Sequence, residues 1–238
     1  MASLSAEEKY SVYAGLMKIG VLMWCDELTA EKYGNTSYKI NKLYCDKHGY
    51  DLVFSSERRH DRDELAWEKV PMVIEHIKKY DYVIWIDADA HFYIDKGPME
   101  DVIMEHPSSH FIFSEDIPDI PPEFLSIDGC LTPSINTGLF IVKNTPESEE
   151  ILNKWAYDDD LFNLRLSCWD QGVVNKMYVT NTCRLRDQSV VLPYNVLQNF
   201  DKETKHDPYI RHLAGPAKRT HGIEKMFRRY LKQIEQDN

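Results

Sequence analysis

The chain is 238 residues long, 43% of them hydrophobic and 28% charged, and its formal net charge is −11. This length suits a globular domain with a substantial core, and the acidic balance argues against nucleic acid as a partner. An anionic substrate would therefore need a locally positive site or a metal ion.

The five cysteines are scattered, and no two of them have the Cys-x-x-Cys spacing. This pattern favours reduced thiols over a disulfide framework or a zinc site. The sequence shows no signal peptide and no apolar run long enough to span a membrane. If it is the whole chain, these features predict a cytoplasmic protein without a transmembrane segment.

The first half of the chain predicts a β-α-β-α-β unit. Gly49 suits the end of one helix, and Pro71 suits the first turn of another while biasing Val70 away from helix. Such alternation is typical of a parallel, nucleotide-binding half-sheet. The expected elements are strands at 18–24, 50–54 and 82–86, helices at 35–48 and 71–80, and a charged loop at 55–64.

The second half of the chain is less regular. The long segment 116–134 contains four prolines and suits a lid or an acceptor wall. We interpret 135–142 as a turn from which a strand runs out. The other expected elements are helices at 98–105, 146–157, 169–178 and from 223 onward, and extended segments at 110–113 and 184–200.

The strand at 82–86 ends in two aspartates, Asp87 and Asp89. A short, wholly apolar strand is typical of the buried centre of a parallel sheet, and such sheets bind ligands at the carboxyl ends of their strands. Two carboxylates there suit a hard divalent cation. An isolated Asp-x-Asp pair is more often a turn, so the choice between a turn and a cation site depends on the remaining motifs. Lys69 can point at an anion in the same crevice or be an ordinary solvated lysine.

Three further groups of polar residues need the same explanation. Asn136, Thr137 and Gly138 form a small polar segment whose glycine allows close approach of backbone to a ligand. Asp170 and Gln171 set a carboxylate beside an amide. In the third group, His212 can supply a neutral imidazole to a metal, Gly215 allows close approach, and Lys218 offers a positive charge to a diphosphate. Taken alone, His212 is more often a loop histidine.

In these residues the chain resembles retaining glycosyltransferases of the GT-A fold. It is most similar to the galactosyl/xylosyl transferases of family 34, and it shares motifs with family 8. The matching segments follow the family's order and cover most of 18–218: they are 41–50, 67–69, 82–90, 136–140, 170–171 and 212–218.

The resemblance implies a single α/β domain over 1–238, with a central, mostly parallel sheet flanked by helices. Residues 18–95 would form the nucleotide-sugar-binding half, and 96–238 the half that binds the acceptor and completes the metal site.

The resemblance also implies a nucleotide-sugar donor, most simply a UDP-sugar, and a glycan or glycoprotein acceptor. Mn²⁺ or Mg²⁺ would be held by Asp87, Asp89 and His212. Trp24 and Tyr33 are expected to frame the nucleotide base. The residues expected to contact the donor are Lys69, Asp87, Asn136, Gly138, Gly215 and Lys218.

Asp170 and Gln171 are the candidate catalytic residues. Cleavage of the sugar–phosphate bond leaves negative charge on the diphosphate, which a metal and Lys218 would stabilise. Asp170 would act as nucleophile or stabilise the oxocarbenium-like sugar, and Gln171 would hold the sugar on that face. Retention of configuration is compatible with a covalent intermediate and with front-face attack, and the sequence leaves both open.

The chain departs from the family in one respect, and its residues also bear on rival functions. The membrane-anchored eukaryotic members carry a transmembrane stem that this chain lacks, which argues against a Golgi location. A phosphatase of the haloacid-dehalogenase type has Thr or Val where His91 stands, and a nucleotidyltransferase needs a Gly-rich loop that 25–29 does not provide. A catalytically degenerate sugar-binding module would keep the same ligands and stays an alternative.

The segment 211–232 is strongly basic, with seven Lys and Arg residues against the single acidic Glu224. It predicts a weak peripheral contact with a membrane or partner. The alternative is a solvated amphipathic helix on an acidic protein.

Overall fold

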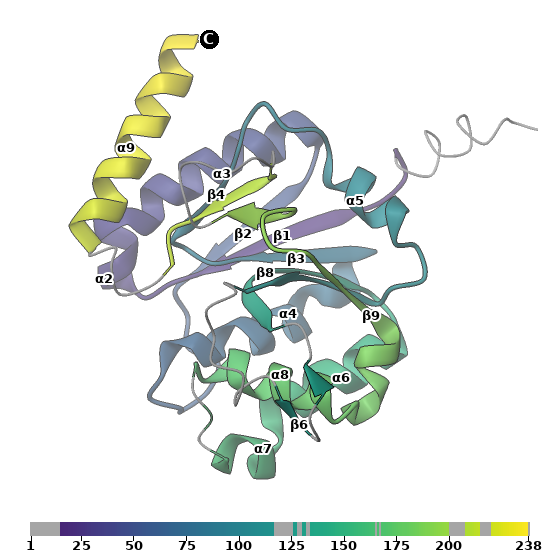
Figure 1. Ribbon diagram of the computed structural model, residues 1–238. Coiled ribbons are helices and arrows are strands. Elements are labelled where there is room, and N and C mark those ends of the chain that lie inside the picture. Colours follow the sequence, from purple (N-terminus) through teal and green to yellow (C-terminus); the bar gives the residue numbers. More distant parts are fainter. Residues whose placement is uncertain are drawn as a thin grey trace, which may run out of the picture.

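The computed structural model describes residues 15–116, 126–127, 130–131, 134–164, 166, 168–199, 208–214 and 220–237. Its centre is a six-stranded sheet in the order β2-β1-β3-β8-β5-β9 (Figure 1). Only β8 runs against its neighbours in this sheet, so the predicted mostly parallel sheet is confirmed. The strands are β1 (Ile19–Trp24), β2 (Asp51–Ser55), β3 (Tyr82–Ile86), β5 (Phe111–Glu115), β8 (Ile135–Lys143) and β9 (Ser189–Leu192).

Helices cover both faces of the sheet. Successive strand residues point to opposite faces, so apolar strands offer a surface for helix packing on each side. Ile84 of β3 belongs to a buried cluster with Tyr44 of α3 (Asn35–His48), on the face that also holds α5 (Met99–Glu105). The neighbouring Trp85 belongs to a second cluster with Val73 of α4. This second face holds α4 (Lys69–His76), α6 (Pro146–Tyr157) and α8 (Asp170–Val179).

Short elements complete the described part of the chain. They are α2 (Glu27–Thr29), a π-helical turn (Ala30–Gly34), α7 (Asp159–Asn163), the hairpin of β6 (Ser126–Ile127) and β7 (Cys130–Leu131), and 3-10 turns at Leu65–Glu68, Ile77–Lys79, Thr182–Arg184 and Arg186–Gln188. The prediction of an extended segment is therefore wrong for residues 184–188.

A second, three-stranded sheet lies beside the Asp-x-Asp segment. It is formed by β4 (Ala90–Phe92), β10 (Gln198–Asn199) and β11 (Ile210–His212), in the order β10-β11-β4. Strand β11 pairs antiparallel with β4 in a register that places His212 opposite Ala90. This pairing brings a histidine from late in the chain next to the aspartates that follow β3.

The start of α4 differs from the prediction. The helix begins at Lys69, directly after a 3-10 turn, and Val70 is helical. Pro71 still lies in the first turn, where its missing N–H needs no partner. The local bias of proline against helix at Val70 is outweighed by packing, since Val70 is fully buried against the sheet.

The sequence predicts a turn at 136–138, but in the structure this segment is part of the continuous strand β8. The pairing of β5 with β8 shifts there: Phe113 lies opposite Phe140, whereas the next residue, Ser114, lies opposite Asn136. Three residues of β8 therefore have no partner on β5 and form a bulge. Bulges bend a strand and re-aim its side chains, and they are common next to active sites.

The C-terminal helix α9 (Thr220–Asp237) packs its apolar side on the rest of the chain. Phe227 and Ile223 form a buried cluster with Ile40 of α3. The exposed side carries the basic residues Lys225, Arg228, Arg229 and Lys232. Among the residues that the structure describes, none forms a helix with the length and apolar character needed to span a membrane.

His91 on β4 is the buried histidine under α9. It is 1% exposed, and its ring stacks on Tyr230 at 4.5 Å and meets Phe227 edge-on at 5.4 Å. Burial lowers the pKa of His91 to about 4, although Nδ1 has a hydrogen bond with the Phe92 carbonyl. The folded protein therefore keeps His91 neutral.

We predict an acid-sensitive contribution of His91 to stability. The unfolded chain has a histidine pKa of about 6.5 and binds a proton first, so the free energy of unfolding should fall by about 2 kcal/mol between about pH 7 and about pH 5. Urea unfolding in EDTA should show this loss in the wild type and a smaller loss in His91→Phe. Equal losses in both proteins would contradict the prediction.

Candidate active site

A cleft of about 210 Å³ lies at the carboxyl ends of β1 and β3. Trp24 and Tyr33, which we expect beside a nucleotide base, both line it. Lys69, Asp87 and Asp89 line it as well. Open α/β sheets bind their ligands at this edge. The cleft thus sets an aromatic wall beside a group of charged side chains.

Asp87, Asp89 and His212 form a candidate metal centre. Their ligand atoms all lie within 4.8 Å of one another, and Nε2 of His212 is 3.2 Å from Oδ1 of Asp89. Neighbouring ligands of an octahedral cation are on the order of 3 Å apart, since each lies about 2.1 Å from the metal. The structure therefore brings together the three residues predicted as ligands, and their oxygen and imidazole atoms suit Mn²⁺ or Mg²⁺.

Asp89 and His212 also stabilise each other's charge. Burial alone would raise the pKa of Asp89, but the adjacent His212 brings it below its ordinary value. Burial alone would lower the pKa of His212, but Asp89 raises it. Metal binding at His212 therefore competes with protonation of the imidazole.

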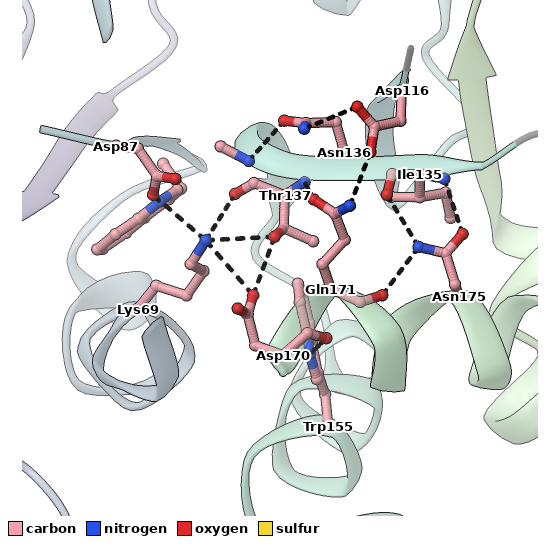
Figure 2. A network of polar contacts seen from close by, with 12 residues as sticks. Lys69, Asp87, Asp116, Ile135, Asn136, Thr137, Trp155, Asp170, Gln171 and Asn175 are labelled. Carbon is pink, nitrogen blue, oxygen red and sulfur yellow. Dashed lines mark hydrogen bonds and ion pairs between the residues drawn. The ribbon is translucent and has the colours of Figure 1, made fainter. Parts of the chain in front are cut away.

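Lys69 is a buried cation between two carboxylates (Figure 2). Its Nζ lies 3.2 Å from Oδ1 of Asp87 and 3.4 Å from Oδ2 of Asp170. It also donates to the carbonyl and hydroxyl oxygens of Thr137, at 3.1 and 3.2 Å. Burial opposes its charge, but Asp170 and Asp87 raise the pKa of Lys69 above its ordinary value. The alternative of a solvated lysine is therefore wrong.

Asp170 is the first residue of α8 and is 2% exposed. Its Oδ2 accepts a hydrogen bond from the Thr137 hydroxyl at 3.0 Å, and its backbone carbonyl accepts one from Nε1 of Trp155 at 2.9 Å. Burial raises the pKa of Asp170 to about 6, with Lys69 opposing the shift and Asp87 adding to it. With this pKa, Asp170 is mostly ionised at neutral pH and becomes protonated at slightly lower pH.

Asp116 connects Gln171 with Asn136 (Figure 2). Nε2 of Gln171 donates to Oδ2 of Asp116 at 2.8 Å, and Nδ2 of Asn136 donates to Oδ1 at 3.2 Å. Oε1 of Gln171 accepts from the Thr137 backbone N–H at 3.2 Å. Because the Asn136 amide is buried and bonded within the protein, its expected contact with the donor stays a prediction.

Gly138 lies against the imidazole of His212. A Cβ atom at this position would be 2.1 Å from Cε1 of His212. The backbone of Gly138 is also engaged, since its carbonyl accepts from the Asp87 N–H at 2.8 Å and its N–H donates to Oδ1 of Asn136 at 2.8 Å. The close approach expected at this glycine is thus made by a candidate metal ligand, while contact with the donor stays a prediction.

Two predicted site residues are not described by the structure, and two observed ones were not predicted from the sequence. Gly215 and Lys218 lie outside the described residues, so their expected contacts with a diphosphate stay predictions. Asp116 and Gln198 were not predicted. Asp116 is the first residue of the long segment 116–134, Gln198 lies in a segment predicted only as extended, and neither belongs to a recognisable motif.

Comparison with known proteins identifies relatives of the chain. A sequence model of the galactosyl transferase GMA12/MNN10 family matches residues 19–220. The chain is 30% identical over 142 residues to probable xyloglucan 6-xylosyltransferase 3 of Arabidopsis thaliana, and 30% identical over 138 residues to probable glycosyltransferase 3 of Oryza sativa subsp. indica. Each match covers 56% of this chain but only 28% and 27%, respectively, of the relative's length.

The fold has a counterpart among solved structures. The chain superposes with a TM-score of 0.68 on the crystal structure of a glycosyltransferase involved in the glycosylation of the major capsid of PBCV-1. The match covers 89% of this chain and 98% of that chain at 15% sequence identity. At this identity the likeness shows a shared fold.

We predict that Gly138→Ala disrupts the candidate metal centre. The added methyl group would occupy the place of the His212 ring and push it away from Asp89, so the affinity for Mn²⁺ should fall by at least about tenfold. Calorimetric titration with Mn²⁺ measures this. Gly222→Ala is the matched control, because a Cβ atom there meets nothing within 4 Å. Equal affinities of the two variants would contradict the geometry.

Proposed function

The chain belongs to the galactosyl transferase GMA12/MNN10 family, and we propose that it transfers a sugar from a nucleotide-sugar donor to a hydroxyl group of a glycan or glycoprotein. The observation that carries the proposal is the meeting of Asp87, Asp89 and His212 beside the cleft. Magnesium-type cations are usually held by one or two carboxylates together with substrate phosphates, and this cluster suits that role.

We propose a UDP-sugar as donor and Mn²⁺ or Mg²⁺ as its cation. The named xylosyltransferase relatives support a pentose donor, and the galactosyl transferase family supports a hexose donor. Trp24 and Tyr33 supply aromatic surface to a planar base in the cleft. The bound cation would neutralise the charge that develops on the leaving diphosphate.

Asp170 is proposed to stabilise the positively charged sugar of the transition state. Its Oδ2 is bonded to Lys69 and Thr137, and its side chain is 3% exposed, which hinders the movement that a nucleophile needs. The arrangement favours retention by front-face attack over a covalent intermediate. Gln171, fixed by Asp116 and Thr137, would hold the sugar at the same face.

A weak peripheral contact through α9 is also part of the proposal. Its exposed Lys225, Arg228, Arg229 and Lys232 would attract anionic headgroups by about 1 kcal/mol for each residue near the surface. Co-sedimentation with phosphatidylserine vesicles at low salt tests this contact. Absence of vesicle binding would favour the alternative of a solvated amphipathic helix.

We predict that UDP binds only together with a divalent cation. Calorimetry should show UDP binding in Mn²⁺ that EDTA abolishes, and Asp89→Asn should weaken it by at least about tenfold because a metal ligand is lost. Asp46→Asn, which changes an exposed carboxylate on α3, is the control. Absence of UDP binding in Mn²⁺ would contradict the donor assignment. Binding without hydrolysis or transfer of any UDP-sugar would favour a binding module.

We also predict that Asp170→Asn separates turnover from binding. The amide keeps the size of the side chain but removes its charge, so kcat should fall by about 10²- to 10³-fold while the Kd for UDP in Mn²⁺ changes little. Transfer or hydrolysis of UDP-sugars measures kcat, again with Asp46→Asn as control. An unchanged kcat would exclude an electrostatic role in the reaction.

A further inference from the structure

We infer that Gln198 is a positioning residue for the metal centre: it holds the His212 imidazole with the proton on Nδ1 and with Nε2 directed at the metal position. The inference rests on the proposed metal site and assigns a function to a residue that no motif marks. It follows from the order of donors and acceptors along a chain of buried side chains.

The chain starts at Asn136, whose amide has a single possible orientation. A backbone N–H can only donate, so the side-chain atom that faces the N–H of Gly138 at 2.8 Å is the oxygen. The other end of the amide faces Oδ1 of Asp116 at 3.2 Å, and an ionised carboxylate can only accept. Two independent partners therefore agree on the orientation.

The orientation of Asn136 determines that of Gln198. Oδ1 of Asn136 also faces Gln198 at 3.0 Å, so the Gln198 atom there must be the donating Nε2. Its Oε1 then faces Nδ1 of His212 at 3.0 Å. Because this oxygen only accepts, Nδ1 must carry a hydrogen. Nε2 of His212 is the ring nitrogen near Asp89, and it is left to bind the metal.

Burial makes this arrangement selective. Gln198 is 0% exposed, His212 2% and Asn136 5%. Turning the Gln198 amide over would face oxygen with oxygen at Asn136, so a buried hydrogen bond would be lost. Such partners of a ligating histidine typically fix its tautomer and its orientation.

The geometry of the small sheet supports the same role. Gln198 lies on β10, the strand next to β11, which carries His212. The His212 ring also lies against Gly138. The hydrogen bond with Gln198 and the close contact with Gly138 thus both restrict the position of the imidazole.

The first test is the affinity of the full chain for Mn²⁺ without nucleotide. Gln198→Met keeps the approximate size but removes both amide functions, and it should weaken Mn²⁺ binding about 10- to 100-fold. Gln198→Glu keeps an acceptor for the Nδ1 hydrogen and should bind more tightly than Gln198→Met. Gln233→Met, on the exposed side of α9, is the matched control and should bind like the wild type.

The second test locates the hydrogen on the His212 ring, first in the wild-type protein and then in the Gln198 variants. ¹⁵N NMR of the Mg²⁺-loaded wild-type protein, with the His212 signal identified by its loss in His212→Gln, should show a hydrogen on Nδ1 and none on Nε2. In folded Gln198→Met the Nδ1 hydrogen should exchange faster with water, whereas in Gln198→Glu it should persist. This readout distinguishes a positioning role from a general loss of stability.

The outcomes separate the inference from the proposed function. Wild-type protein that binds Mn²⁺, with Gln198→Met binding equally well or with the hydrogen on Nε2, would overturn the inference and leave the proposed metal site standing. Wild-type protein that binds neither Mn²⁺ nor Mg²⁺ would overturn the metal site and the inference together.

Discussion

The pairing of Lys69 with Asp87 and Asp170 is the interaction on which the site depends. One buried ammonium group joins the end of β3 to the first residue of α8, and its bonds to Thr137 add the bulge of β8. Without it, the buried carboxylate of Asp170 would have no cation between it and the partly exposed carboxylate of Asp87, and the two like charges would repel. The ion pairs therefore hold the proposed metal side and the proposed sugar side of the site in a common frame.

The bulge of β8 allows one short segment to serve both sides. In a regular strand, Thr137 and Gly138 would each have a place in the ladder with β5. Here they are left over from the pairing. Thr137 directs two oxygens at Lys69, and Gly138 bonds the backbone of Asp87 while making room for His212. The irregularity is thus a condition for the geometry of the site.

The parts of the molecule that could be predicted have local signals. The strand at 82–86 shows as an apolar run, and the metal residues show as motifs in a familiar order. Asp116 and Gln198 could not be predicted, because they bond to partners 55 and 62 residues away and no local pattern marks a buried amide. The helical state of Val70 was missed for a related reason, since tertiary burial outweighed the bias of the following proline.

The charge balance of the site explains how a protein of net charge −11 can be expected to bind an anionic donor. Among the residues that the structure describes, Lys69 is the cation paired with Asp87 and Asp170 when His212 is neutral, and it cannot turn to a phosphate without leaving its carboxylates unpaired. A divalent cation bound to the aspartates would relieve part of their charge. Lys69 could then exchange its bond to Asp87 for one to a phosphate oxygen. Its expected contact with the donor is therefore conditional on the cation, which is a physical reason for nucleotide and metal to bind together.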